Sequence, residues 1–371
     1  MDILIVTQDF APEKGGIQTY VIELAKSFLA NGHTVRVICP GRKDEVNPLP
    51  GLAELVRISV HSSWLFLPLL TYLPRYLKRH PTVTRVLYAQ WQGALAELFM
   101  STSKKQHRSY ALVHGRELLT SVLGPLAHFL MPKVFARMDA AFPNSAEVMR
   151  LTRALARPAC PLHLAHPGVD PEQFHPMDAN FLRQRYGLES KKILLCITRM
   201  VARKNLKRLI EVMPLVLSEV PDVVLLLGGN GPEREALQTQ TRDLGLQNQV
   251  RFLGRILDEE LVAHFNLADV FTLPSFSSPK DIEGFGIVFL EAGACEVAAV
   301  GSLSGGIPDA VEDGVTGLLV PPEDLIKLKN ALLSLLKNPT WAQTMGKNAR
   351  IRIEKGFSWS HAGKRLLAFM T

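Results

Sequence analysis

Short apolar runs alternate along the chain with longer segments in which apolar residues recur every three or four positions. The first run covers residues 3–7, and a segment with helical spacing follows at residues 19–31 and ends at Gly32. Further apolar runs at residues 34–39, 83–89 and 110–113 continue the alternation. Strands and helices in this order are typical of a parallel sheet with helices on its faces.

The pattern starts again after residues 166–171, which are rich in Pro and Gly and which we interpret as a linker. Strands are predicted at residues 192–198, 223–228, 250–253 and 270–273, and helices at residues 205–220, 234–244 and 286–295. A length of 371 residues suits two domains. We therefore expect an α/β fold with two Rossmann-like halves, residues 1–168 and 169–356, that bind ligands at the carboxyl ends of their strands.

Residues 64–80 depart from this pattern, because an apolar stretch passes into an aromatic and then a basic one. The apolar part is too short to span a bilayer. One interpretation is an element at a membrane surface, with aromatic anchors and basic residues that meet anionic head groups. The anchors would be Trp64, Tyr72 and Tyr76, and the basic residues Arg75, Lys78 and Arg79. The alternative is a core helix of the first domain with a solvated basic end.

Charge is distributed unevenly between the two halves. The first 168 residues hold 19 Lys and Arg against 11 Asp and Glu, and the remainder holds 23 against 24, within a formal net charge of +7. A basic first half favours an anionic partner. The basic residues are not interleaved with aromatic residues as in a nucleic-acid-binding module, so no nucleic-acid partner is predicted.

The four cysteines lie among apolar or small residues without metal-type spacing: Cys39, Cys160, Cys196 and Cys295. Buried, reduced thiols of a cytosolic protein are the expectation. The first residues show no basic segment followed by a long apolar run, so no signal peptide is expected. We predict a cytoplasmic protein, peripheral on the inner face of the membrane if residues 64–80 bind lipid.

The most specific stretch, residues 273–292, joins a strand to a helix through a polar loop and the sequence Glu283-Gly-Phe-Gly. Its glycines let backbone N–H groups approach a ligand, and the N-terminus of the helix favours an anion. Glu283 in the loop suits sugar hydroxyls, and Glu291, about two turns into the helix, suits a ribose diol. The apolar residues between them argue against two acids on a solvated face.

Arg199 and Lys204 flank the turn after the strand at residues 192–198. Two cations at this end of a strand suit a diphosphate, and they would stabilise the charge that grows on a leaving nucleoside diphosphate. The alternative is a surface basic cluster shared with Arg203, Lys207 and Arg208.

Two further features follow strands of the first half. Gly15-Gly16 could bring a backbone amide to the same phosphate. His114, followed by Gly115, would lie at the carboxyl end of its strand, where it could bond a sugar hydroxyl or help a proton leave. The alternative is a structural histidine whose hydrogen bonds are all made within the protein.

Several nucleotide-site patterns are missing from the sequence. No GxxxxGK[ST] occurs, which excludes the common P-loop NTPases. The glycine loop at residues 229–232 has Arg234 where the dinucleotide fingerprint needs a third glycine, so a dehydrogenase is disfavoured. No Asp-x-Asp occurs either, and we expect no metal and no other cofactor.

Taken together, these motifs resemble glycosyltransferase family four, whose members are retaining enzymes with the GT-B fold. The matches keep the family's order over nearly the whole chain: Gly15-Gly16, His114-Gly115, Asn144-Ser145, Pro167 to Asp170, Arg199 with Lys204, Gly229 to Pro232, Phe252 to Gly254, Glu283 with Glu291, and Ser304 to Asp309. The resemblance implies an acceptor-binding first domain and a donor-binding second domain that face each other across a cleft. A C-terminal helix within residues 357–371 would cross back onto the first domain.

Residue roles follow from the resemblance. The residues that would carry out the transfer are His114, Arg199, Lys204 and Glu283, with His114 beside the reacting sugar. The nucleotide-sugar donor would be held by Gly16, Arg199, Lys204, Arg255, Glu283, Phe285, Gly286, Ile287 and Glu291. The donor is a substrate rather than a cofactor, and members of the family usually need no metal. The resemblance also implies front-side attack, in which the leaving phosphate helps to deprotonate the acceptor.

Within the family, the HGRE, RMVARKN and DIEGFGIVFLEA stretches look closest to phosphatidylinositol mannoside mannosyltransferases. This implies GDP-mannose as the donor and a lipid-linked or glycan hydroxyl as the acceptor. UDP-glucose or UDP-N-acetylglucosamine with a soluble or polysaccharide acceptor stays open, as do an epimerase or phosphorylase and a non-catalytic membrane-surface protein of the same fold. Asn205 departs from the family, because it replaces a Gly after the donor lysine, although Asn tolerates unusual backbone angles.

Overall fold

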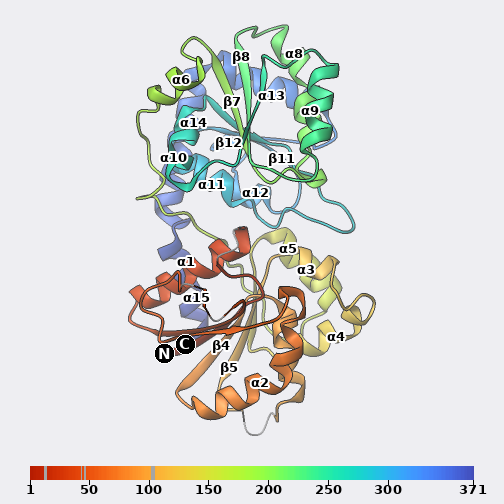
Figure 1. The fold of residues 1–371 in the computed structure, drawn as a ribbon, viewed down its shortest axis with the longest axis vertical. Helices are drawn as coiled ribbons and strands as arrows, with labels where there is room; N and C mark the ends of the chain where they lie inside the picture. The colour runs from red at the N-terminus through yellow and green to blue at the C-terminus, as the bar shows by residue number, and fades with distance from the viewer. Residues whose placement is uncertain (12–14, 43, 46, 102–104) are drawn as a thin grey trace. The chain divides into compact units, whose positions relative to one another are not determined.

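The computed structural model describes residues 1–11, 15–42, 44–45, 47–101 and 105–371. Their backbone divides into two compact units. Unit 1 comprises Met1–Pro167 and Trp359–Thr371, and unit 2 comprises Gly168–Ser358. Each unit is built around one parallel sheet of six strands that is covered by helices (Figure 1).

Unit 1 contains the sheet β3-β2-β1-β4-β5-β6. Its strands are β1 (Asp2–Val6), β2 (Thr34–Pro40), β3 (Glu54–Ile58), β4 (Val83–Tyr88), β5 (Arg108–Val113) and β6 (Ala140–Pro143). Its helices and turns are α1 (Gly16–Ala30), η1 (Ser62–Trp64), α2 (Phe66–Arg79), η2 (Trp91–Phe99), α3 (Arg116–Leu119), α4 (Leu126–Phe135), α5 (Ala146–Leu151), η4 (Thr152–Ala156) and α15 (Trp359–Met370). The strand order reverses between β1 and β4, and open α/β sheets bind ligands beyond the carboxyl ends of the strands at such a point.

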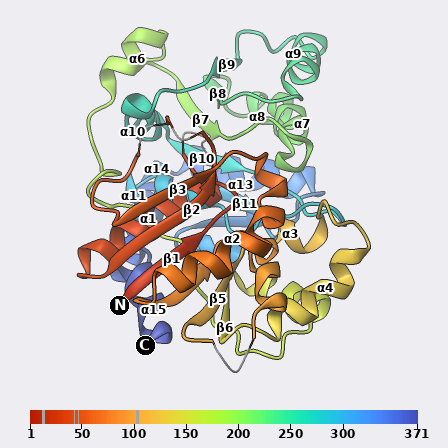
Figure 2. The ribbon, with the colours of Figure 1, turned by 60° about the horizontal axis from the view of Figure 1, so that its bottom comes forward.

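The helix α15 belongs to unit 1, where it packs on α1. The two helices approach closely at Gly363, because a Cβ there would lie 2.1 Å from the hydroxyl oxygen of Ser27. The rings of Trp359 and Tyr20 lie 5.6 Å apart. Both ends of the chain therefore lie in unit 1, close to each other (Figure 2). The predicted return of the C-terminal helix to the first domain is confirmed.

Unit 2 contains the sheet β12-β11-β10-β7-β8-β9, whose order reverses between β10 and β7. Its strands are β7 (Lys192–Ile197), β8 (Val223–Gly228), β9 (Val250–Gly254), β10 (Val270–Leu273), β11 (Ala299–Ser302) and β12 (Gly317–Val320). Its helices and turns are α6 (Asn180–Tyr186), η5 (Ala202–Lys204), α7 (Leu206–Glu211), α8 (Met213–Leu217), α9 (Arg234–Asp243), α10 (Asp258–Leu267), α11 (Ile287–Ala294), α12 (Ile307–Ala310), α13 (Leu325–Lys337) and α14 (Pro339–Gly356).

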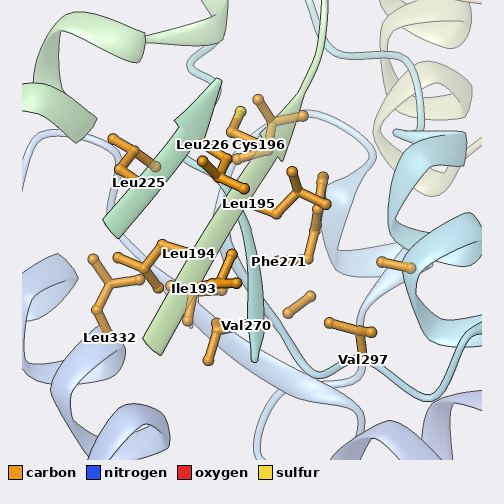
Figure 3. Packing of buried hydrophobic residues seen from close by; sticks show 14 of the residues in the cluster. Ile193, Leu194, Leu195, Cys196, Leu225, Leu226, Val270, Phe271, Val297 and Leu332 are labelled. Carbon is orange, nitrogen blue, oxygen red and sulfur yellow. The ribbon is translucent and has the colours of Figure 1, made fainter. Parts of the chain in front are cut away.

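The core of unit 2 lies on both faces of its central strands. Every residue of β8 is buried, as expected for a parallel strand covered by helices on both sides. Figure 3 shows leucines of β7 and β8 packed beside Phe271 of β10, with Leu332 of α13 among the residues of this cluster. Long apolar runs that are buried on both faces hold the strands in place and fix where the polar loops at their carboxyl ends begin.

The predicted fold class is confirmed, since both halves are Rossmann-like parallel sheets. One predicted helix, at residues 205–220, is wrong. The chain forms α7 and α8 with Val212 between them, because Pro214 in the first turn of α8 has no N–H group to continue the helix. Four strands were not predicted, namely β3, β6, β11 and β12. Each has only four or five residues.

Candidate active site

Unit 2 gathers charged side chains where β7 and β10 lie side by side. Lys204 ends the turn η5 after β7, and Glu283 lies in the loop after β10. The ammonium group of Lys204 donates a hydrogen bond to a carboxylate oxygen of Glu283, and both side chains are buried. The structure therefore brings two of the predicted site residues into direct contact.

Arg203 completes this buried charge cluster. Its guanidinium donates to Glu283 at 2.5 Å and pairs with Asp281 at 3.2 Å, and the hydroxyl of Ser275 donates to Glu283 at 3.3 Å. Burial by itself would raise the pKa of Glu283, but the charges of Lys204 and Arg203 lower it to about 2. Glu283 is therefore ionised at neutral pH. Arg203 is half-buried and pairs with two acids instead of belonging to a basic cluster alone, and the two acids in Asp281-Ile-Glu283 could have indicated two basic partners.

The backbone of Glu283 is held by the loop after β11. The N–H group of Gly306 donates to the carbonyl oxygen of Glu283 at 2.8 Å. Gly305 has a φ of 58°, and a Cβ there would lie 2.3 Å from the same oxygen. Asn205, next to Lys204, has a φ of 56°, so its left-handed backbone confirms that it takes the place of a glycine.

Helix α11 begins directly after the loop of Glu283, with Gly286 at its N-cap and Phe285 buried before it. The first backbone N–H groups of α11, those of Ile287 and Val288, have no acceptor one turn back and suit an anion, whereas the N–H of Phe289 donates to the carbonyl oxygen of Gly286 at 3.0 Å. Glu291 is the fifth residue of α11, little more than one turn in rather than the two expected. Burial raises the pKa of Glu291 to about 7, so this carboxyl group changes its charge near neutral pH.

Arg199 and Arg255 differ from the buried cluster because both are exposed. Neither guanidinium forms a hydrogen bond or an ion pair with the other residues that the structure describes. The N–H group of Met200 donates to the carbonyl oxygen of Asn230 at 2.9 Å. The glycine loop after β8 therefore supports the backbone segment that carries Arg199.

In unit 1, His114 follows β5 at the carboxyl edge of the sheet. Its Nε2 lies 3.0 Å from the carbonyl oxygen of Ala89, and its ring meets that of Tyr20 edge-on at 5.4 Å. Burial lowers the pKa of His114, although the carboxylate of Glu117 acts in the opposite direction. The imidazole is therefore neutral at pH 7, with the proton on Nε2 toward Ala89 and with Nδ1 as an acceptor. Gly16 is exposed and begins α1.

Residues 64–80 form η1 and α2, whose helix has two different faces. The inward face is buried and ends with Tyr76, whose hydroxyl donates to Glu54 at 2.6 Å. The prediction of Tyr76 as a membrane anchor is wrong, because its ring belongs to the core of unit 1. An exposed outer stripe is spaced by three or four residues and consists of Trp64, Leu67, Thr71, Arg75 and Lys78. Arg79 is exposed beside this stripe, and Tyr72 is half-buried.

Within the described ranges, no helix is long and apolar enough to cross a bilayer. Across the same residues, no three His, Cys, Asp or Glu side chains come together in a group suited to a metal ion. All four cysteines are buried and free of disulfide bonds, as predicted.

Comparison with known proteins agrees with this arrangement. The family description "Glycosyltransferase Family 4" matches residues 14–173, and "Glycosyl transferases group 1" matches residues 178–352. A GDP-mannose-dependent alpha-(1-6)-phosphatidylinositol monomannoside mannosyltransferase of Mycolicibacterium smegmatis is 34% identical over 100% of this chain and 98% of its own. The protein of the same name from Mycobacterium tuberculosis is 31% identical over 99% and 97%.

Solved structures share the fold. The sucrose-phosphate synthase of Thermosynechococcus elongatus matches 99% of this chain and 97% of its own with a TM-score of 0.83 at 22% identity. Anabaena HepE in complex with UDP matches 99% of both chains with a TM-score of 0.82 at 19% identity. With two family matches that together span nearly the whole chain and a full-length relative at 34% identity, this chain belongs to glycosyltransferase family 4 and is a glycosyltransferase.

Proposed function

We propose that this enzyme transfers mannose from GDP-mannose to a hydroxyl group of a phosphatidylinositol mannoside, with retention of the anomeric configuration. The observation that carries the proposal is the 34% identity to a mannosyltransferase of that specificity over essentially the full length of both chains. Two further relatives with the same kind of name are 31% and 30% identical over at least 98% of this chain. The buried charge cluster of unit 2 supports it, because a nucleoside diphosphate is the leaving group.

In this proposal unit 2 binds the donor. Lys204 has three N–H donors and uses one on Glu283, so the others are available to a diphosphate oxygen. The exposed Arg199 and the free N–H groups of α11 add positive charge for the same phosphates. Glu283 accepts hydrogen bonds from the hydroxyls of mannose, and Glu291 accepts them from the ribose. Arg255 and Phe285 complete the donor-binding set.

The transfer itself breaks the bond between the mannose C1 and the diphosphate oxygen and forms a bond from C1 to the acceptor oxygen. The proton of the acceptor hydroxyl passes to the leaving phosphate, which departs as GDP. Lys204 and Arg199 stabilise the charge that develops on this oxygen. His114 is neutral, so it binds a hydroxyl through Nδ1 and positions the sugar without adding charge.

The lipid acceptor requires contact with a membrane surface, and we propose the outer face of α2 for it. Trp64 and Leu67 are 46% and 49% exposed at one end of the stripe, and the basic residues Arg75, Lys78 and Arg79 lie toward the other. An aromatic and apolar end beside a basic end suits the boundary between head groups and acyl chains. The enzyme would then be a cytoplasmic protein that attaches reversibly to anionic lipid.

The test uses the purified full chain with phosphatidylinositol monomannoside in mixed micelles. GDP-mannose, UDP-glucose and UDP-N-acetylglucosamine are compared as donors, both for product formation and for the rise in Tm that donor binding causes. The expected result is a mannosylated lipid and a Tm rise with GDP-mannose alone. Turnover with a UDP-sugar in preference to GDP-mannose would overturn the proposed donor.

A further inference from the structure

The carboxyl edge of the sheet in unit 1 carries polar side chains that the proposed function has not used. Gln8 follows β1, Gln92 lies in η2 after β4, Glu117 lies in α3 after β5, and Asn144 follows β6. We call these four residues the open polar set. Each has one atom that is shielded from solvent and has no hydrogen-bond partner in the described structure: Gln8 Nε2, Gln92 Oε1, Glu117 Oε2 and Asn144 Oδ1.

Hydrogen bonds connect the loops that carry the open polar set. The backbone N–H of Gln8 donates to the side chain of Gln90 at 2.9 Å, and the indole of Trp91 donates to the carbonyl of Glu117 at 2.9 Å. The N–H of Asn144 donates to the last residue of β5 at 3.0 Å. The set therefore belongs to one continuous edge, which includes the β1–β4 switch point where such sheets bind ligands.

The open atoms are deeply placed. Gln92, Glu117 and Asn144 are only 6%, 8% and 7% exposed. Among the described residues, the buried side-chain atoms without a hydrogen-bond partner include four at this one edge. Native proteins pair nearly all buried polar atoms, so a concentration at one edge indicates that a ligand supplies the missing partners.

The chemistry of the open atoms selects the ligand. Three of them are acceptors, and one of these is a carboxylate oxygen, so the ligand must donate hydrogen bonds and must not be an anion. A phosphodiester has only acceptors, and its negative charge would be repelled by the carboxylate of Glu117. Hydroxyl groups both donate and accept, so they satisfy the Gln and Asn side chains whichever way each amide is turned.

We propose that the open polar set binds the hydroxyl groups of the acceptor's polyol or sugar ring, and that the acceptor's phosphate lies outside it. This rests on the proposed function, because it names the acceptor class that unit 1 recognises. Glu117 is the central member of the set. Its Oε1 accepts a hydrogen bond from the backbone N–H of His114 at 2.6 Å, which holds the carboxylate in place and leaves Oε2 for a hydroxyl.

The first test separates a binding role from a structural one. The variant Gln92→Met removes an unpaired buried acceptor and keeps a side chain of similar size, so we expect Tm to rise by about 2 °C or more. The KM for phosphatidylinositol monomannoside should rise at least tenfold, with the KM for GDP-mannose unchanged. Gln249→Met is the matched control, because Gln249 Oε1 is also buried and unpaired but lies in unit 2. It should raise Tm without changing either KM.

A lower Tm in Gln92→Met would show that the protein or ordered water already satisfies this side chain, and would overturn the proposal. An acceptor KM that stays at the wild-type value in Gln92→Met would overturn it as well.

The second variant is Glu117→Gln, which keeps an acceptor for the backbone N–H of His114 and turns the open acceptor into a donor. It should raise the acceptor KM at least tenfold while GDP-mannose still raises Tm as in the wild type.

Direct binding provides a readout that does not depend on turnover. Myo-inositol and methyl α-mannoside at millimolar concentration should raise the Tm of the wild-type protein but not that of Glu117→Gln, and glycerol 3-phosphate should raise neither. If glycerol 3-phosphate alone binds, the set recognises the phosphate and the proposal is wrong. If GDP-mannose fails to bind while the polyols do, the donor assignment fails and the present inference stands.

Discussion

The polar groups at the carboxyl edge of the sheet in unit 2 are paired with one another, whereas several of those at the corresponding edge in unit 1 have no hydrogen-bond partner in the described structure. In unit 2, Lys204 and Arg203 both form ion pairs with the buried carboxylate of Glu283, which is therefore compensated without any ligand. In unit 1, the open polar set consists of two amide acceptors, one amide donor and one carboxylate oxygen, and none of these atoms has a partner. The same type of sheet therefore prepares for ligands in two different ways.

The difference follows from what each arrangement costs in stability. A buried ion that loses its partner destabilises a protein by several kcal/mol, whereas an unpaired neutral polar atom costs about 1–3 kcal/mol. A fold can leave a few neutral atoms open for a ligand, but a buried charge needs compensation in advance. The one carboxylate of the open polar set, that of Glu117, receives a hydrogen bond from the backbone N–H of His114 at 2.6 Å. In unit 2, Glu283 compensates the buried charge of Lys204. When the donor binds, the ammonium group of Lys204 contacts both Glu283 and the diphosphate.

The largest expected effect comes from the cations of unit 2. Lys204→Ala and Arg199→Ala should each lower kcat for mannose transfer by about 100-fold or more, since each removes charge stabilisation from the leaving diphosphate. Their effects on Tm should differ. Lys204→Ala removes a partner of buried Glu283 and lowers Tm, whereas Arg199 is exposed and its loss leaves Tm unchanged.

Steady-state kinetics and thermal unfolding check both variants, with Lys207→Ala as the control. Lys207 is exposed and belongs to the same basic segment, but it follows the turn η5 rather than ending it. Near wild-type turnover in either Lys204→Ala or Arg199→Ala would show that the charged edge does not serve a diphosphate.

The second prediction concerns three basic residues of unit 1 that are exposed on α2. Changing Arg75, Lys78 and Arg79 together to Gln should weaken binding to anionic vesicles roughly tenfold or more at low salt, given about 1 kcal/mol for each basic residue near such a surface. Transfer to a short-chain, micellar acceptor should change much less. Vesicle co-sedimentation at low and high salt measures the effect. Unchanged vesicle binding would show that the outer stripe does not meet the membrane.

A smaller effect is expected at Glu291, whose pKa of about 7 lies above its usual 4.5. Because the folded protein favours the protonated form, this carboxyl group contributes stability below about pH 4.5 and loses it as the pH rises through about 7. Only the ionised form accepts hydrogen bonds from both ribose hydroxyls. The KM for GDP-mannose should therefore fall several-fold between pH 6 and 8.

Glu291→Gln provides the comparison for this prediction. The variant should show neither the pH-dependent KM nor the loss of unfolding free energy near pH 7. A variant that keeps the wild-type profile would place the titration on another group.

The smallest expected effect is that of a chelator. The charged edge of unit 2 supplies its positive charge from side chains and from the N-terminus of α11, so excess EDTA should leave the rate of mannose transfer unchanged. Complete loss of turnover that added Mg²⁺ or Mn²⁺ restores would show that these cations are not sufficient.

The sequence predicts the sheets well because their strands are buried on both faces. The boundaries of β8 and β10 agree with the predicted ranges, and every residue of both strands is buried. Single-turn features are harder to predict. The break between α7 and α8 depends on Pro214, and the position of Arg203 depends on a fold that brings Asp281 within reach, which no local periodicity records.

In the candidate site too, some residues could be predicted from the sequence and others only from the folded structure. Glu283 and Lys204 were predicted from motif positions, and the structure joins them. The two faces of α2 were not separated, because Tyr72 and Tyr76 are alike in sequence and only the packing against Glu54 distinguishes them. The open polar set also escaped prediction, since glutamines and asparagines after strands are common and their missing partners become visible only when the loops are in place.

The contact of α15 with α1 has a consequence for how the protein is made. A ribosome at about 5–20 residues per second completes unit 2 only on the order of 10–40 s after the last residue of the first segment of unit 1 has been added. During that time the surface of α1 around Ser27 has no helix to cover it. Unit 1 therefore reaches its final packing only after unit 2 has been synthesised, because residues 359–371 follow unit 2 in the chain.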